Sequence, residues 1–186
     1  MGLTLITPPL QSAVSLDMVK THLRVDHNEE DAIIAAYVEA ATQSLDGIDG
    51  ALGRCLINQT WKLTLDSFPE FIEIPLPPCQ SITSVTYVDV AGAVQTLAPI
   101  NYQAVGLGGV SAASIHPAYG KSWPTARSQP EAISVTFVAG YGPSYAEIPE
   151  PIIARLLARV GALYAHREGL PTPDDDFLIN YRTWAF

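Results

Sequence analysis

The order of apolar and polar positions along the chain predicts a helical start, a β-rich middle and a helical end. Ser15 stands before an apolar turn that also carries Asp17, an arrangement typical of a capped helix start, so we expect a short helix to about Arg24. A second helix is predicted from Asn28 to about Asp49–Gly50. Its expected apolar stripe, at helical spacing, is Ile33, Tyr37, Ala40, Ala41, Leu45 and Ile48.

The middle of the chain changes from the helical period to the two-residue period of strands. Ile57–Leu65 alternates apolar and polar residues and gives the clearest strand signal. Further strands are predicted at Phe71–Ile74, Ile82–Val88, Val94–Leu97, Tyr102–Val105 and Ile133–Val138. Asp89–Gly92 has the composition of a hairpin turn, whereas Gly106–Gly109 and Pro117–Pro130 are expected to be long connections. Short antiparallel strands at this spacing predict a small sandwich or barrel.

A helical pattern returns after Pro149. Its expected apolar stripe, ending near Glu168–Gly169, is Ile153, Leu157, Val160 and Tyr164. We expect this stripe to pack on the second helix and form the core. The tail beyond Gly169 has a Pro- and Asp-rich stretch followed by four large aromatic residues, which are Phe177, Tyr181, Trp184 and Phe186. Such residues imply that the tail either folds back or binds a partner.

The predicted fold class is therefore α+β, with N-terminal and C-terminal helices packed together as a small helical bundle and a β-rich insertion between them. The predicted division is an N-terminal helical part (1–55), the β-rich insertion (56–148), a C-terminal core helix (149–169) and a possible partner-docking tail (170–186).

Composition narrows the functional classes. The chain has 186 residues, of which 48% are hydrophobic and only 16% charged, as expected of a self-sufficient globular protein with a buried core. The net charge of -9 argues against a protein that clamps nucleic acid, because that affinity comes chiefly from Lys and Arg. Residues 1–50 hold eight acids and two bases, a net charge of -6, so the acidic surface belongs to this segment. We expect a soluble protein of a reducing compartment, with no targeting or membrane segment and with Cys55 and Cys79 as buried thiols.

Candidate chemistry is sparse. Four histidines occur without the spacing of a metal pair, and the glycine-rich stretches lack the lysine of a phosphate loop. No GxSxG elbow is present, so nothing nominates a catalytic residue, a metal site or a cofactor. Two alternatives to a structural protein stay open. A β-rich module that binds a ligand or peptide without catalysis would use the aromatic loop Tyr119–Pro124, and a cryptic hydrolase would need a nucleophile that we do not find.

An ordered set of segments, covering about residues 3–170, resembles the phage head-tail connector (adaptor) proteins and their relatives in gene transfer agents. The segments that carry the resemblance are Leu5–Pro9, Val14–Leu16, Lys20–Asp26, Glu30–Ala35, Asn58–Trp61, Leu65–Pro69, Pro75–Pro78, Ile82–Asp89, Tyr119–Pro124, Val135–Gly142 and Pro149–Ile152.

The resemblance implies a non-enzymatic virion protein that forms a ring, expected to be twelvefold, at the head-tail junction. Such a ring would join the portal to the tail, to a tail terminator or to the next connector (stopper), and DNA would pass through it without specific binding. The subunits would be made in the host cytoplasm. Within that expectation, Glu29, Glu30 and Asp31 are candidates to line the channel, where their charge would repel phosphate; the alternative is an ordinary solvated helix face. The aromatic tail is a candidate anchor for the portal, since Phe177, Tyr181 and Trp184 would share one face of a short helix.

Overall fold

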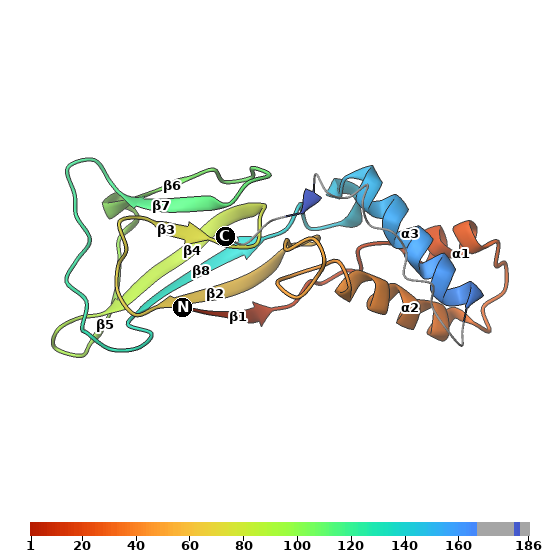
Figure 1. The fold of residues 1–186 in the computed structure, drawn as a ribbon, viewed down its shortest axis with the longest axis horizontal. Helices are drawn as coiled ribbons and strands as arrows, with labels where there is room; N and C mark the ends of the chain where they lie inside the picture. The colour runs from red at the N-terminus through yellow and green to blue at the C-terminus, as the bar shows by residue number, and fades with distance from the viewer. Residues whose placement is uncertain (167–180, 183–186) are drawn as a thin grey trace. The chain divides into compact units, whose positions relative to one another are not determined.

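The computed structural model describes residues 1–166 and 181–182, which fold as an α+β protein of two compact units (Figure 1). The β unit comprises Met1–Pro8 and Asn58–Gly140, and the helical unit comprises Pro9–Ile57 and Tyr141–Phe186. Each unit is thus built from two separate stretches of the chain. None of the helices in the described part is long and apolar enough to cross a membrane.

The β unit contains two antiparallel sheets. The five-stranded sheet has the order β1 (Gly2–Thr7), β2 (Gln59–Leu65), β8 (Ile133–Ala139), β4 (Cys79–Val88) and β5 (Val94–Thr96). The three-stranded sheet has the order β3 (Ile72–Ile74), β7 (Ala113–Pro117) and β6 (Tyr102–Val105). A 3-10 turn, η1 (Pro99–Asn101), precedes β6.

Alternation along the strands places one face of each sheet in the core. In β2 the register pairs Trp61 with Phe137 and Leu63 with Val135, and all four side chains are buried. This confirms the alternating pattern from which a strand was predicted here. The buried residues of the two sheets together form the core of the β unit; they include Trp61, Leu63, Ile72, Ile74, Val85, Ala113, Ile115, Ile133, Val135, Phe137 and Ala139.

The hairpin between β4 and β5 confirms the predicted turn. The Asp89 carboxylate accepts hydrogen bonds from the backbone N–H groups of Ala91 and Ala93, both at 2.9 Å. Gly92 has a φ of 89°, in the left-handed region that glycine adopts without strain. Hydrogen bonding, chiefly from the Gln95 side chain and the backbone, lowers the pKa of Asp89.

Two strands differ from the sequence-based expectation. Gly2–Thr7 was assigned to the helical first part but forms β1, which pairs with β2 in a register that joins Gly2 to Thr64. Ala113–Pro117 was not predicted as a strand but forms β7, the central strand of the small sheet. β1 pairs with a strand some sixty residues away, so local pattern alone could not identify it. β7 pairs with the nearby β6, where Val105 faces Ser114, so its short alternating pattern was available in the sequence.

The helical unit contains α1 (Leu16–Leu23), α2 (Asp31–Gln43) and α3 (Glu150–Ala165), with a short 3-10 turn, η2 (Tyr145–Glu147), before α3. The α1 cap is confirmed, because Ser15 Oγ accepts a hydrogen bond from the Met18 N–H at 3.2 Å. Arg24 ends this helix in the left-handed conformation, with a φ of 59°.

The limits and the buried face of α2 correct the prediction. The helix starts at Asp31 rather than after Asn28, and it ends at Gln43 rather than near Asp49–Gly50. Its buried residues are Ile34, Val38 and Ala41, continued by Leu45 beyond the helix. Ile33 and Ile48, assigned to the stripe, are 39% and 55% exposed. The error arises because Ile33 and Ile34 are neighbours among alanines, so either could begin an apolar face.

The last helix packs on α2, as expected, and α1 packs on both. Its buried apolar residues are Ile152, Ile153, Leu156 and Val160, and Leu157 and Tyr164 of the predicted stripe are partly buried and pack against this core. The core of the helical unit also contains Val14, Val19, Ile34, Val38, Leu45, Leu52, Leu56 and Ile57. Cys55 and Cys79 are both buried, and neither forms a disulfide.

Substitution of the two adjacent isoleucines distinguishes the true face of α2 from the predicted one. Ile34 is fully buried, so Ile34→Ala should lower the free energy of unfolding by about 2 to 5 kcal/mol. Ile33→Ala, at an exposed position of the same helix, should change it by less than about 1 kcal/mol. Chemical denaturation followed by circular dichroism measures both, and equal losses would contradict the assigned face.

Candidate functional site

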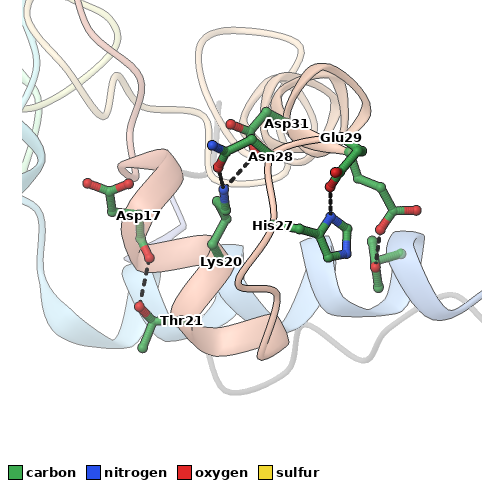
Figure 2. Close-up of polar contacts among 9 residues, drawn as sticks. Asp17, Lys20, Thr21, His27, Asn28, Glu29 and Asp31 are labelled. Atoms are coloured by element: carbon green, nitrogen blue, oxygen red, sulfur yellow. Dashed lines mark hydrogen bonds and ion pairs between the residues drawn. The ribbon is translucent and has the colours of Figure 1, made fainter.

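The candidate site is the acidic connection between α1 and α2, which carries the three residues proposed to line a channel (Figure 2). Glu29 precedes α2, Glu30 occupies its N-cap position and Asp31 is its first residue. Negative charge at this end of a helix is favourable, because the helix dipole is positive there. The three acids are adjacent in sequence, yet their side chains have different surroundings.

Asp31 forms an ion pair that ties α2 to α1. Its Oδ1 lies 2.8 Å from Lys20 Nζ, and the side chains of Lys20 and Asp31 are 13% and 33% exposed. Lys20 also donates a hydrogen bond of 2.6 Å to Asn28 Oδ1 (Figure 2). Lys20 therefore holds two points of the acidic connection, and much of the charge of Asp31 is compensated within the helical unit.

Glu30 is engaged with the last helix. The hydroxyl of Tyr164, in α3, donates a short hydrogen bond to Glu30 Oε2. This contact joins the start of α2 to the far end of α3. Glu30 is thus a residue that holds the helical unit together, whatever else its charge does.

Glu29 is the acid of the three whose carboxylate lies in solvent. Its side chain is 81% exposed, and its Oε2 lies 2.8 Å from Nδ1 of His27, itself 46% exposed (Figure 2). This contact is an ion pair only when His27 is protonated. Asp17, in the first turn of α1, and Asp26, on the connection, are also exposed and border an open hollow. The solvent-facing negative charge therefore comes from Asp17, Asp26 and Glu29.

The connection offers surface charge rather than catalytic chemistry. Its hollow is lined by Asp17, Lys20, Thr21, Arg24, Val25 and Asp26. Thr21 Oγ1 donates to the Asp17 carbonyl oxygen at 2.8 Å, so this hydroxyl is not presented to a base that could activate it. In the described residues, no group of three or more His, Cys, Asp or Glu side chains could hold a metal ion.

The aromatic tail is described at one of its four predicted positions. Tyr181 packs, half-buried, against the core of the helical unit, and Arg182 Nε donates a hydrogen bond of 3.1 Å to the Ala51 carbonyl oxygen. Phe177, Trp184 and Phe186 lie outside the described residues. At Tyr181, then, the chain folds back on its own unit, which is one of the two alternatives left open by the sequence.

A second polar cluster, around Arg54, was not anticipated. Arg54 is 3% exposed and donates a hydrogen bond of 2.8 Å from one terminal nitrogen to the Tyr141 hydroxyl. Burial raises the pKa of Tyr141, and the adjacent Arg54 acts in the opposite direction. The two residues are 87 positions apart, so no local motif could have indicated the pair.

In the β unit, the aromatic loop considered for ligand binding is fixed by Trp123. Its ring stacks on Phe68 with centroids 4.9 Å apart and planes at 10°, and its Nε1 donates to the Glu70 carbonyl oxygen at 3.2 Å. Tyr119, in the same loop, is fully exposed. An open hollow beside the stack is lined by Asp66, Ser67, Phe68, Trp123, Pro124, Ala126, Arg127 and Ser128.

A comparison with protein families finds a match in the first half of the chain. Residues 13–103 match the phage gp6-like head-tail connector protein family. This segment, 91 of the 186 residues, is similar to that family. The match includes α1, the acidic connection and α2, together with most of the strands that follow. It confirms the resemblance identified in the sequence.

Solved structures share the fold over the whole chain. A chain in the neck of an empty gene transfer agent (GTA) particle, computed with C6 symmetry, is 22% identical with a TM-score of 0.80. Chains in the virion of a native GTA particle and in the neck of a native GTA particle computed with C12 symmetry are each 21% identical, with TM-scores of 0.81 and 0.79. In each case all of this chain matches 97% of the other. No curated protein sequence matches.

The contact of Tyr181 yields a prediction about the tail. Tyr181→Ala should lower the free energy of unfolding by about 1 to 2 kcal/mol, because a half-buried aromatic contact with the core is lost. Tyr119→Ala, at a fully exposed position, is the matched control and should leave stability unchanged.

Truncation after Gly169, assayed for melting temperature and for portal binding, separates the two roles of the tail. Loss of portal binding at an unchanged melting temperature would mean that the tail serves docking alone.

Proposed function

We propose that this chain is a structural head-tail connector (adaptor) without catalytic activity. In this proposal it assembles as a dodecameric ring, joins the portal of a phage-like capsid to the tail or to the next connector, and surrounds the DNA channel. The observation that carries the proposal is the family match over residues 13–103, which covers α1, α2 and their acidic connection. The fold shared with chains of GTA necks, one of them computed with C12 symmetry, supports the ring and its copy number.

The surface of the chain suits a subunit that neighbours cover. Only 16% of residues are charged, and several large apolar side chains are well exposed, among them Leu10 at 92% and Ile48 at 55%. Repetition of one head-to-tail contact closes a ring at a fixed number of copies, and each such contact covers two different surface regions. Exposed apolar residues scattered over both units are what such packing requires.

We assign different roles to the parts of the chain. The helical parts, 1–55 and 149–169, build the inner part of the ring, and the β-rich insertion, 56–148, faces outward or toward neighbouring components. Residues 170–186 dock on the portal. Because Tyr181 packs on its own helical unit, that docking would use Phe177, Trp184 and Phe186, or would follow release of Tyr181.

The acidic connection is proposed to face the DNA. With a net charge of -6 in residues 1–50 of every copy, a ring would present a strongly negative inner surface. Such a surface repels phosphate, so DNA slides through without adhering. The exposed carboxylate of Glu29, with Asp17 and Asp26, contributes directly, whereas Glu30 and Asp31 add charge while holding the helices.

A second candidate function is supported by the hollow beside Trp123. Its mixed lining of aromatic and polar groups, including Phe68 and Arg127, could accept a ligand or a short peptide. The hollow is open, so it would bind weakly. A ligand-induced rise in melting temperature for a chain that stays monomeric would favour this function over the connector.

The mass of the protein in solution tests the ring. Light scattering is measured on the purified chain alone and after mixing with a portal assembly. A ring of twelve 20.0-kDa chains would weigh about 240 kDa, and we expect this species in at least one of the two conditions. A 20.0-kDa monomer that also ignores the portal would contradict the connector function.

Two variants, each of which removes three carboxylate charges, test whether the acidic residues line the DNA channel. Glu29→Gln with Glu30→Gln and Asp31→Asn should impair DNA passage without preventing ring assembly, and should also lower the melting temperature, because the contacts to Tyr164 and Lys20 are weakened. Asp17→Asn with Asp26→Asn and Glu29→Gln changes mainly exposed groups, so it should impair passage with a smaller fall in melting temperature than the first variant. Particle infectivity measures passage, and normal infectivity in both variants would remove the channel role.

A further inference from the structure

The five-stranded sheet of the β unit ends in two strands that no other described strand covers. In the order β1-β2-β8-β4-β5, β1 pairs only with β2 and β5 only with β4 (Figure 1). An edge strand exposes a row of backbone N–H and C=O groups that can pair with another chain. Proteins that stay monomeric usually protect such edges with very short strands, charged residues, proline, β-bulges or a covering loop.

The β1 edge is only partly protected, by an irregularity in its pairing between Leu5 and Thr7. Gly2–Thr7 contains neither a charged residue nor a proline. Leu5 pairs with Trp61 and shares its face of the sheet, yet Leu5 is 41% exposed while Trp61 is buried. Ile6, on β1 as well, is 52% exposed. The apolar core of the β unit is therefore incompletely covered along this edge.

The opposite edge is also open. All three residues of β5, Val94, Gln95 and Thr96, are exposed, and none is charged. Val94 is 72% exposed, as is Val90 in the adjoining hairpin turn. Each copy of the chain thus carries two uncharged edge strands on opposite sides of one sheet, and β5 is protected only by its short length.

The number of strands determines how these edges can meet. Every pairing in the sheet is antiparallel, so strand direction alternates across the five strands. Because five is odd, β1 and β5 run in the same direction. Copies in a ring follow one another by the same rotation, so a β1 edge that meets the next β5 edge would pair in parallel. A two-fold dimer would instead join two β1 strands, or two β5 strands, in antiparallel fashion.

We infer that β1 of one copy pairs in parallel with β5 of the next copy, so that the five-stranded sheets of a ring form one continuous sheet. The occupant of each edge is a second copy of this chain, because one copy supplies both edges in the matching direction. The contact is short on the β5 side, so it adds to other contacts between subunits rather than replacing them. This inference rests on the proposed ring.

Site-specific cross-linking tests the contact. Thr4 pairs with Lys62 and Thr96 pairs with Thr86, so both threonines lie on the outer face of the sheet, and both are exposed. Neighbouring strands lie roughly 5 Å apart, within reach of a short bismaleimide. The double variant Thr4→Cys with Thr96→Cys is assembled, its ring mass is verified by light scattering, and the reagent is added at neutral pH.

The native cysteines provide a low background. Cys55 and Cys79 are both buried, and burial raises the pKa of the Cys79 thiol to about 11, so little thiolate forms at neutral pH. The unsubstituted chain and the two single variants are the controls.

A ladder of dimer, trimer and larger species in the double variant alone is the expected result. An assembled ring without cross-links overturns the inference and leaves the connector function standing. Cross-linked dimers from Thr4→Cys alone indicate a two-fold contact and also overturn it. A chain that never assembles, alone or on a portal, overturns the connector function and this inference together.

A variant that places a charge on the β1 edge tests the same contact independently of cross-linking. Ile6→Lys places a charge on the exposed edge strand and should abolish or weaken assembly while the melting temperature stays unchanged. Ile100→Lys, at a position 79% exposed outside the sheet, is the matched control and should assemble normally. Normal assembly of Ile6→Lys would overturn the inference.

Discussion

The helical unit depends on the packing of α2 on α3, two helices that come from opposite sides of the β-rich insertion. Ile34, Val38 and Ala41 on one helix and Ile152, Leu156 and Val160 on the other are buried in the core from which both helices gain stability. α1 packs on this pair, and the loop after α2 contributes Leu52 and Leu56 to the same core. Without that contact neither the acidic connection nor the Arg54–Tyr141 pair would have a fixed framework.

The acidic first segment combines structural and surface roles. Asp31 and Glu30 face Lys20 and Tyr164 and thereby connect the three helices, whereas Glu29 projects into solvent. A count of charges treats these residues as equivalent, but a carboxylate in an ion pair contributes less to the external potential than one surrounded by water. The field presented to a partner is thus set by fewer residues than the net charge suggests.

Sequence predicted the elements whose signals are local. The Ser15 cap, the alternation of β2 and the Asp89 turn involve residues within a few positions of one another, and all three are confirmed. The start of α2 was misplaced because Asn28, Glu29 and Glu30 all suit a helix N-terminus, and β1 was missed because its partner strand is some sixty residues away. In the site, the residue types were visible, but the pairing of Glu30 with Tyr164, 134 positions apart, is a product of tertiary packing.

The register of β2 and β8 has a consequence for how the chain folds. Gln59 pairs with Ala139, and beyond the sheet the backbone of Tyr141 bonds to Leu56, so the two ends of the insertion run side by side. If the whole stretch between the end of α2, at Gln43, and the start of α3, at Glu150, were an unstructured loop, bringing the two helices together would cost about 4 kcal/mol of chain entropy. Once the β unit has folded, that cost has already been met, and the two helices are joined as if by a short turn. Early formation of the β unit would therefore speed the docking of α2 on α3.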